Sequence, residues 1–278
     1  MKSYSLGLYE KAMPNNLSLY EKLKIIDDIG YDFMEISIDE TNEKLDRLNM
    51  SKEERCKLLN YMKNSGTKIN TMCLSAHRKY ALGSKDDVVS NKGLKIMEEA
   101  ISLATDLNIK IIQLAGYDVY YEESTEETRH KFIVNVTKCA EMAAESGILL
   151  GFETMDTPFM DTIKKANNYV ETVNSPYLNI YPDCGNITNA YDGNIEDIKS
   201  DIIHGKGRII AMHLKEVEKG KYRDVSFGDG WVDFKAVIET SLNCGIKTYV
   251  TEFWQQDENW LSEIEKVYNK IKCIFKEI

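Results

Sequence analysis

Short apolar runs alternate with longer amphipathic stretches along the whole chain, and this alternation constrains the fold more than any other feature. Each apolar run has the length of a buried strand, and each following stretch carries apolar residues at helical spacing. We predict strands at residues 4–9, 33–38, 69–74, 109–115, 148–153, 178–183, 208–214 and 248–253. We predict helices at 17–29, 52–65, 87–107, 125–146, 161–173, 194–203, 233–243 and 257–276. Such alternation is typical of consecutive β–α units.

The number of units favours a closed barrel over an open sheet. An open, doubly wound sheet usually carries a glycine-rich phosphate-binding turn after its first strand, and the sequence GLYEKA at 7–12 is not such a turn. No linker rich in proline, glycine or serine divides the 278 residues, and barrels of about 250 residues commonly form one core. We therefore predict an α/β fold of the (β/α)8 TIM barrel class, with residues 1–278 forming a single domain.

Composition and charge exclude several classes of function. The net charge of −10 works against an extended basic surface, so tight nucleic-acid binding would need a local basic patch that the sequence does not show. The N-terminal sequence MKSYSLGLYEKAM has no apolar signal-peptide core, and no segment approaches the roughly 18 apolar residues that span a membrane. The six cysteines form no C-x-x-C pair. We expect a cytoplasmic protein without a nucleic-acid or membrane partner.

Four residues that can ligate a metal stand at the ends of four successive predicted strands. They are Glu153, Asp183, His213 and Glu252, separated by 30, 30 and 39 residues, or about one strand and one helix each. In a (β/α)8 barrel, the carboxyl ends of the parallel strands meet at one mouth, where active sites form. Three carboxylates and one imidazole suit a hard or borderline cation. We predict that these residues bind one divalent metal ion, which is Zn, Mn, Co or Mg.

Two of these carboxylates also suggest a reaction. Glu153 and Glu252 belong to the fifth and eighth strands, so they should approach a bound substrate from different sides. A metal chelated by a carbonyl oxygen and a neighbouring hydroxyl oxygen acidifies the hydrogen on the carbon between them and stabilises the enediolate. One carboxylate would remove this proton and the other would return one. Return on the opposite face gives an epimerase, and return to the neighbouring carbon gives an aldose–ketose isomerase.

Longer sequence blocks resemble one known family. The chain resembles the xylose-isomerase-like TIM barrels and, among them, the L-ribulose-5-phosphate 3-epimerases, also called L-xylulose-5-phosphate 3-epimerases, of bacterial ascorbate and pentose use. The resemblance extends from residue 4 to beyond 250. It rests on the blocks GLYEKAMP (7–14), FMEISIDETNEKLDRL (33–48), MCLSAHRKYALGS (72–84), IQLAGYDVYYEE (112–123), YPDCGN (181–186), MHLKE (212–216) and FGDGWVDF (227–234).

The resemblance implies a metal at Glu153, Asp183, His213 and Glu252, with Glu153 and Glu252 as the acid/base pair that inverts C3 of a ketopentose phosphate. Free-sugar 3-epimerases of the same superfamily carry a substrate-binding histidine three residues after the aspartate ligand. This chain has Asn186 at that position, which disfavours a free ketohexose substrate.

Residues near other strand ends are candidates for binding the substrate. Charge-assisted hydrogen bonds to a phosphate are among the stronger ones, so a basic residue here can pair with the substrate phosphate. A simpler alternative for each is a loop residue in a salt bridge or in solvent. The FGDG turn at 227–230 can either offer backbone N–H groups to a phosphate or form a tight turn before a helix. The candidates are Glu35, Ser75, His77, Arg78, Tyr117 and Lys215.

Other functions stay open at this point. The same enediolate serves isomerisation of a hexulose phosphate and epimerisation of another ketose. A metal-dependent endonuclease of abasic DNA uses the same barrel, but the isoelectric point near 5.1 disfavours it. A non-catalytic sugar-phosphate sensor is the alternative from another class. Barrels of this kind often dimerise, and the tyrosine-rich segment 117–121 offers a surface, so we predict a homodimer.

Overall fold

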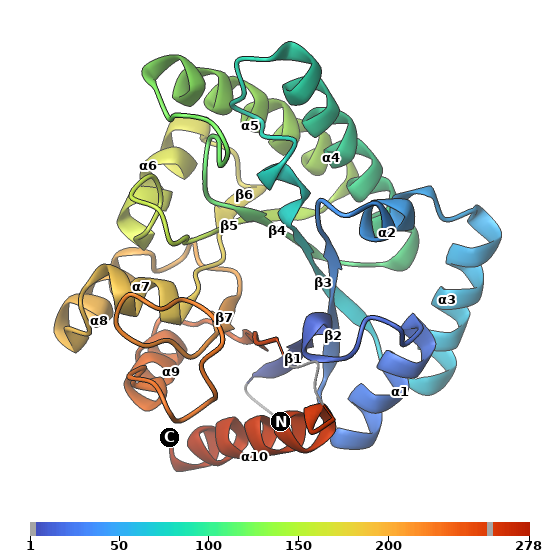
Figure 1. The fold of residues 1–278 in the computed structure, drawn as a ribbon, viewed down its shortest axis with the longest axis vertical. Coiled ribbons are helices and arrows are strands. Elements are labelled where there is room, and N and C mark those ends of the chain that lie inside the picture. The colour runs from blue at the N-terminus through green and yellow to red at the C-terminus, as the bar shows by residue number, and fades with distance from the viewer. Residues whose placement is uncertain (1–3, 255–257) are drawn as a thin grey trace.

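Eight parallel strands surround a central axis in the computed structural model, which describes residues 4–254 and 258–278 (Figure 1). The strands pair in the order β6-β5-β4-β3-β2-β1-β8-β7. The predicted α/β fold of the (β/α)8 TIM barrel class is therefore confirmed. The strands are β1 (Ser5–Tyr9), β2 (Phe33–Ile38), β3 (Ile69–Leu74), β4 (Ile111–Ala115), β5 (Leu149–Glu153), β6 (Leu178–Ile180), β7 (Met212–Leu214) and β8 (Thr248–Thr251).

The barrel closes between β6 and β7 through single bridges rather than a continuous ladder. Parallel bridges join Ile180 to Ile209 and Asp183 to His213. The amide of His213 donates to the carbonyl of Pro182 at 2.9 Å. Proline has no N–H to return, so the ladder is interrupted here and β6 is shorter than the predicted 178–183. The seam that closes the barrel therefore joins two of the predicted metal ligands.

Helices form an outer ring around the strands (Figure 1). Several begin and end at the residues that the sequence indicates, because Ser18, Ser51 and Thr125 cap their amino ends and Gly30, Gly66 and Gly147 end them at positive φ. The long helices are α1 (Leu19–Ile29), α3 (Lys52–Ser65), α4 (Asp87–Leu107), α5 (Glu126–Ser146), α6 (Ile163–Val173), α8 (Ile195–His204), α9 (Phe234–Asn243) and α10 (Trp260–Glu277).

Short elements that the sequence analysis did not predict lie near the mouth. The last helix was predicted to begin at residue 257, which lies outside the described residues. Asp183 caps the short helix α7 by accepting a hydrogen bond from the amide of Asn186 at 2.8 Å, which fixes one of its oxygens. The short elements are η1 (Glu10–Ala12), α2 (Asn42–Leu45), η2 (Asp46–Asn49), η3 (Ser75–Arg78) and α7 (Cys184–Ala190).

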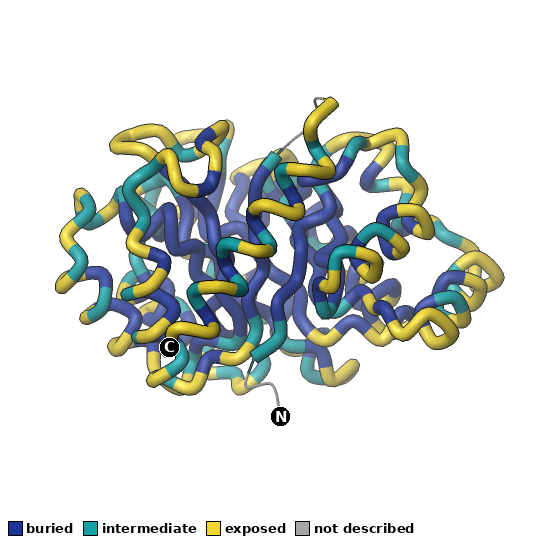
Figure 2. Tube along the Cα trace, turned by 90° about the horizontal axis from the view of Figure 1, so that it is seen from below, coloured by how far each residue is buried: buried dark blue, intermediate teal, exposed yellow. Residues whose placement is uncertain are grey.

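The strands are buried on both faces, as the dark central tube in Figure 2 illustrates. A large apolar core fills the space between sheet and helices. A smaller cluster of buried side chains belongs to inward-facing strand positions and includes Phe33, Tyr181 and Val250. Gly7 makes room for it, because a Cβ there would lie 2.3 Å from the ring of Phe33. Within the described part of the chain, no helix combines the length and apolarity needed to cross a membrane.

Candidate metal and active site

The four predicted metal ligands converge at the carboxyl ends of β5 to β8. Glu153 is the last residue of β5, and His213 lies within β7. Asp183 lies three residues after the end of β6, and Glu252 directly follows β8. Alternate strand residues point into the barrel, and this register directs all four side chains to the axis. Their ligand atoms lie within 4.8 Å of one another, and all four residues are buried.

His213 occupies the centre of the cluster. Its Nδ1 lies 3.2 Å from Glu153 Oε1 and 3.1 Å from Glu252 Oε2. Its Nε2 lies 2.6 Å from Glu35 Oε1 on the other side of the ring. The imidazole is fully buried, with no exposed surface. One ring nitrogen therefore faces the predicted ligands, and the other faces a fourth acidic residue of the barrel interior.

Negative charge exceeds positive charge at this site. Glu35, Glu153, Asp183 and Glu252 are buried together, and Lys215 is the neighbouring lysine. Lys215 Nζ lies 2.8 Å from Asp183 Oδ2 and 4.0 Å from Glu252 Oε2.

Two carboxylate oxygens at this site, Asp183 Oδ2 and Glu252 Oε2, are buried and accept no well-directed hydrogen bond. Buried charges normally require pairing. The surplus of acidic oxygens and the two unsatisfied atoms fit a divalent cation held by Glu153, Asp183, His213 and Glu252.

The crowding of charge shifts the pKa values of these groups. Burial raises the pKa of Glu153, and the adjacent charge of Glu252 raises it further. Burial likewise raises the pKa of Asp183, to about 7, with Glu252 and Glu153 acting in the same direction and Lys215 against it. Burial also opposes ionisation of Glu252, but His213 and Lys215 outweigh it and hold its pKa well below the usual range. The carboxylates are thus strongly inequivalent.

Three further side chains hold the ligands in place. The sequence analysis missed Gln113 and Thr154, and it noted Asn186 only as a departure from the free-sugar 3-epimerases. Gln113 on β4 donates through Nε2 to Glu153 Oε2. Thr154 Oγ1 accepts a hydrogen bond from the amide of Asp183 at 3.0 Å. Asn186 donates through Nδ2 to the carbonyl of Thr154 at 2.7 Å. Gln113 lies on the strand next to β5, and Thr154 and Asn186 lie within three residues of a predicted ligand. This closeness to the ligands is the sequence signal that could have identified them.

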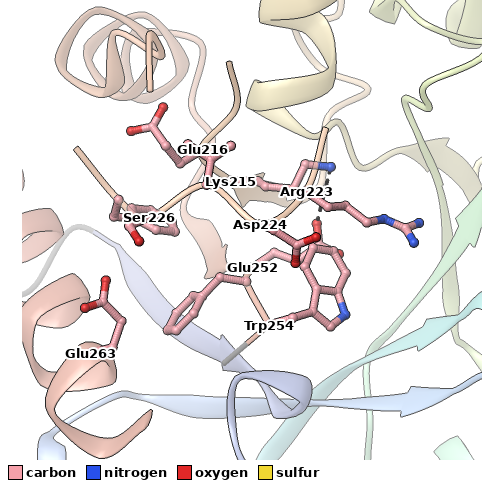
Figure 3. Close-up of a pocket in the computed structure, with 11 residues that line it drawn as sticks. Lys215, Glu216, Arg223, Asp224, Ser226, Glu252, Trp254 and Glu263 are labelled. Atoms are coloured by element: carbon pink, nitrogen blue, oxygen red, sulfur yellow. Dashed lines mark ion pairs between the residues drawn. The ribbon is translucent and has the colours of Figure 1, made fainter. Parts of the chain in front are cut away.

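The site opens into two adjoining cavities at the mouth. One has a volume of about 70 Å³ and is lined by Ser75, Arg78 and Lys215 of the predicted substrate-binding set. The other, of about 180 Å³, is shown in Figure 3 and shares Lys215, Arg223, Glu252 and Trp254 with the first. The sequence analysis did not single out Tyr9, Lys11, Tyr222 and Arg223 as lining residues.

Three predicted substrate-binding residues have other surroundings. Tyr117 is buried against Ala115 and Met155, which line the smaller cavity, rather than lining it itself. His77 Nε2 lies 3.1 Å from the carbonyl of Gly93 on α4, and burial lowers its pKa to about 4. Glu35 lies behind His213. Substrate contact by Glu35 or His77 finds no support in this arrangement, since neither lines the cavities.

Lys215 and Asn186 form a pair at the edge of the cluster. Lys215 Nζ donates to Asn186 Oδ1 at 2.8 Å while also facing Asp183. Burial alone would lower the pKa of Lys215, but Asp183, Glu252 and Glu153 raise it. Lys215 therefore stays charged while lining both cavities. A fixed ammonium beside the predicted ligands can donate a hydrogen bond to an oxygen of a bound sugar.

The FGDG segment forms a turn in which the amides of Gly228 and Asp229 are already engaged. The carboxylate of Glu216 accepts hydrogen bonds from the amides of Val217 at 3.3 Å, Gly228 at 2.9 Å and Val232 at 3.1 Å. Gly230 is required beside it, since a Cβ there would lie 2.4 Å from Glu216 Oε1. The Gly228 amide therefore serves the loop 217–232, which favours the tight-turn interpretation over a phosphate cradle.

Comparison with known proteins agrees with this geometry. The sequence model of the xylose isomerase-like TIM barrel family matches residues 23–270. L-ribulose-5-phosphate 3-epimerase UlaE of Shigella flexneri is 42% identical over 276 residues, which cover 98% of this chain and 95% of that protein. The Escherichia coli K12 protein of the same name has the same identity and coverage. The chain belongs to the L-ribulose-5-phosphate 3-epimerase family of xylose isomerase-like TIM barrels. It is an enzyme of the isomerase class, as the resemblance predicted.

Solved structures share the fold at much lower sequence identity. An L-ribulose 3-epimerase aligns with a TM-score of 0.79 at 17% identity, over 99% of this chain and 95% of that chain. D-psicose 3-epimerase from Clostridium cellulolyticum H10, solved with D-tagatose, aligns with a TM-score of 0.80 at 13% identity, over 98% and 99% of the two chains. These similarities establish the barrel architecture.

Proposed function

We propose that the protein is a metal-dependent 3-epimerase that interconverts L-ribulose 5-phosphate and L-xylulose 5-phosphate. The observation that carries this proposal is that Glu153 and Glu252 both lie beside His213 Nδ1, at 3.2 Å and 3.1 Å. They arise from β5 and β8, so two carboxylates reach one reacting carbon from different directions. The 42% identity to an L-ribulose-5-phosphate 3-epimerase supports this substrate.

Glu153, Asp183, His213 and Glu252 would hold one divalent cation, which we propose to be Zn, Mn, Co or Mg. When bound, this cation supplies positive charge beside the substrate carbonyl and so acidifies the neighbouring C–H bond. Gln113 orients Glu153 through its donated hydrogen bond. One of the two glutamates then removes the C3 proton from one face, and the other delivers a proton to the opposite face.

The other lining residues would hold and orient the sugar phosphate. Lys215 faces the ligands and would donate to a sugar oxygen at the reacting end. Arg78 and Lys11 line the smaller cavity on the β1 and β3 side, and we propose that they bind the phosphate. Ser75 would donate to the sugar from the same side. Tyr117 would support this wall through its contact with Met155.

The proposed reaction is tested by incubating the Mn²⁺-loaded protein with L-ribulose 5-phosphate in deuterated water and observing C3 by NMR. We expect deuterium at C3 together with formation of L-xylulose 5-phosphate. Glu153→Gln should abolish both, whereas Glu218→Gln, which changes a half-exposed loop carboxylate, should leave them intact. Unchanged turnover in Glu153→Gln would remove this residue from the acid/base pair.

Other results of the same experiment would replace the proposal. Exchange or conversion at another carbon would indicate an aldose–ketose isomerase, such as a hexulose-phosphate isomerase, or a different ketose epimerase. Absence of exchange with every divalent metal would favour a non-catalytic sugar-phosphate sensor, and cleavage of abasic DNA would favour the endonuclease. We further propose that the protein acts in the cytoplasm and that it forms a homodimer. Size-exclusion chromatography with light scattering tests the homodimer.

A further inference from the structure

The imidazole of His213 has a second buried partner that the proposed chemistry does not use. Nδ1 faces the predicted ligands Glu153 and Glu252, so a cation at this cluster would take that nitrogen. Nε2 on the far side of the ring lies 2.6 Å from Glu35 Oε1. A neutral imidazole has one N–H donor and one lone pair. A proton fixed on Nε2 by Glu35 leaves the Nδ1 lone pair directed at the cluster.

Glu35 is itself held by two hydroxyl groups. Its Oε2 accepts a hydrogen bond from Thr71 Oγ1 at 2.7 Å and another from the hydroxyl of Tyr181 at 2.8 Å. Glu35, Thr71 and Tyr181 have no exposed surface. Both carboxylate oxygens are therefore engaged inside the barrel, and Glu35 lines neither cavity at the mouth.

Gly151 of β5 provides the space that Tyr181 occupies. A Cβ at this position would lie 2.8 Å from the Cβ of Tyr181 and 3.2 Å from Ile210 Cδ1. The missing side chain leaves space for the Cβ of Tyr181. The ring of Tyr181 packs against His213 with a ring-centroid distance of 4.8 Å. The same tyrosine thus contacts the imidazole with its ring and Glu35 with its hydroxyl.

We propose that Glu35 is a positioning residue of the metal centre, which fixes the tautomer and orientation of His213, rather than a residue that binds substrate. This inference rests on the proposed metal site. A carboxylate that accepts the distal N–H of a metal-binding histidine orients the ring and increases its basicity as a ligand. Removing such partners typically lowers metal affinity about 10- to 100-fold. Thr71 and Tyr181 in turn fix the carboxylate.

The test compares Mn²⁺ binding to metal-free wild-type protein and Glu35→Gln by isothermal titration calorimetry. Glutamine keeps the volume and removes the charge, so we expect affinity to fall about 10- to 100-fold. At saturating Mn²⁺, the KM for L-ribulose 5-phosphate should stay within about twofold of wild type, because the proposed substrate contacts are untouched. Equal Mn²⁺ affinity with a raised KM would overturn the inference and return Glu35 to the substrate-binding set.

Two further variants form a graded series around Glu35. Tyr181→Phe and Thr71→Val each remove one hydrogen bond to Glu35 and leave its contact with His213 in place. We expect each to weaken Mn²⁺ binding less than Glu35→Gln, by a few-fold. The visible absorption of the Co²⁺-loaded protein should change in the same order. If Glu35→Gln does not fold, unchanged Mn²⁺ affinity and Co²⁺ spectra in both hydroxyl variants would overturn the inference.

The wild-type measurement separates this inference from the proposed function. Wild-type protein that binds Mn²⁺ and epimerises the substrate, beside a Glu35→Gln variant with the same Mn²⁺ affinity, would refute the positioning role alone. Wild-type protein that binds no divalent cation at the cluster would refute the metal site itself, and the positioning role with it. Circular dichroism and thermal unfolding of each variant establish that the compared proteins are folded.

Discussion

Two clusters of buried charge lie at the mouth of this barrel, and they differ in how their charge is balanced. In the first, Glu10 after β1 is surrounded by Arg47, Lys22 and Lys44. Lys22 Nζ lies 3.1 Å from Glu10 Oε2, and Arg47 Nη2 donates to the same oxygen at 3.0 Å. The amide of Ser37 donates to Oε1 at 2.7 Å. Glu10 therefore has cations and donors on every side.

In the second cluster, Glu35, Glu153, Asp183 and Glu252 have only His213 and Lys215 as basic partners among the described residues. The pKa values of Glu10 and Glu153 differ accordingly. Burial alone would raise the pKa of Glu10, but Arg47 and Lys22 outweigh it and lower it to about 2. Burial and the charge of Glu252 raise the pKa of Glu153. Ionised Glu10 is stabilised by the fold, whereas ionised Glu153 is not.

This difference in charge balance distinguishes a structural cluster, around Glu10, from a functional one, around His213. Removing a charge from water costs several kcal/mol, and a structural cluster recovers this through partners within the chain. The Glu10 cluster ties the segments after β1 and β2 together in this way. The cluster around His213 has more carboxylates than basic partners, and two of its buried carboxylate oxygens accept no well-directed hydrogen bond, which is what a site that takes its counter-charge from solution requires. The following predictions test this distinction.

The largest expected effect is on turnover. Glu153→Gln should lower kcat about 10²- to 10⁴-fold, the usual contribution of a general acid or base. The same change should leave the free energy of unfolding of the metal-free protein unchanged or higher, because the fold disfavours the ionised form of Glu153. Steady-state kinetics and urea unfolding in the presence of a chelator measure the two effects. A large loss of stability would contradict the functional assignment of this carboxylate.

The opposite pattern is expected at Glu10. Glu10→Gln leaves Lys22 and Arg47 buried without their counter-charge, so the free energy of unfolding should fall by about 3–5 kcal/mol. Urea denaturation at pH 7 measures this loss. As a control, Asp28→Asn removes the exposed ion pair with Lys24 and should cost less than about 1 kcal/mol. Equal costs for the two variants would mean that the Glu10 cluster is not structural.

The stability that Glu10 contributes should depend on pH. Its pKa is about 2 in the folded protein against a reference value of 4.5. A lowered carboxyl pKa stabilises the fold above the reference value, and this stabilisation is lost as the pH falls from 4.5 through 2. The shift corresponds to about 3 kcal/mol. The stability difference between wild type and Glu10→Gln should therefore shrink as urea titrations move from pH 7 to pH 3. A constant difference would refute the ionic origin.

The smallest expected effect is stabilisation by the metal. Mn²⁺ at about 100 times its Kd should raise the free energy of unfolding by about 2.7 kcal/mol. Glu10→Gln should retain this gain, and Glu153→Gln should lose most of it, since only Glu153 belongs to the predicted ligand cluster. Thermal unfolding with and without Mn²⁺ provides the comparison. Loss of the gain in Glu10→Gln would show that the two clusters are energetically coupled.

The fold was largely predictable because strand and helix periods are local properties of the sequence. The strands at 33–38 and 69–74 and the helices at 52–65 and 87–107 have the predicted bounds. The β6 strand was predicted too long because the break at Pro182 depends on the neighbouring β7, which sequence periodicity does not report. The sequence also did not indicate the short helices α2 and α7, because each is shorter than the stretch of residues over which a helical period can be recognised.

The convergence of the four candidate ligands was predictable, whereas the residues that support them were not. Glu153, Asp183, His213 and Glu252 follow from position, because a strand end fixes where a side chain lies in a barrel. Glu35 lies within β2 and not at its end, and only the three-dimensional arrangement reveals that its carboxylate is engaged by Thr71, Tyr181 and His213. His77 lies in the short η3 helix after β3 and turns toward α4.

The carboxylate of Glu216 gathers three amides of the loop 217–232, which carries Tyr222 and Arg223 along the cavity wall. This carboxylate thereby fixes the loop at Val217 and again at Gly228 and Val232, and Tyr222 and Arg223 lie between these fixed points. Replacing Glu216 would release these points at once, so a single side chain outside the metal cluster would decide how Tyr222 and Arg223 are presented to a bound sugar phosphate.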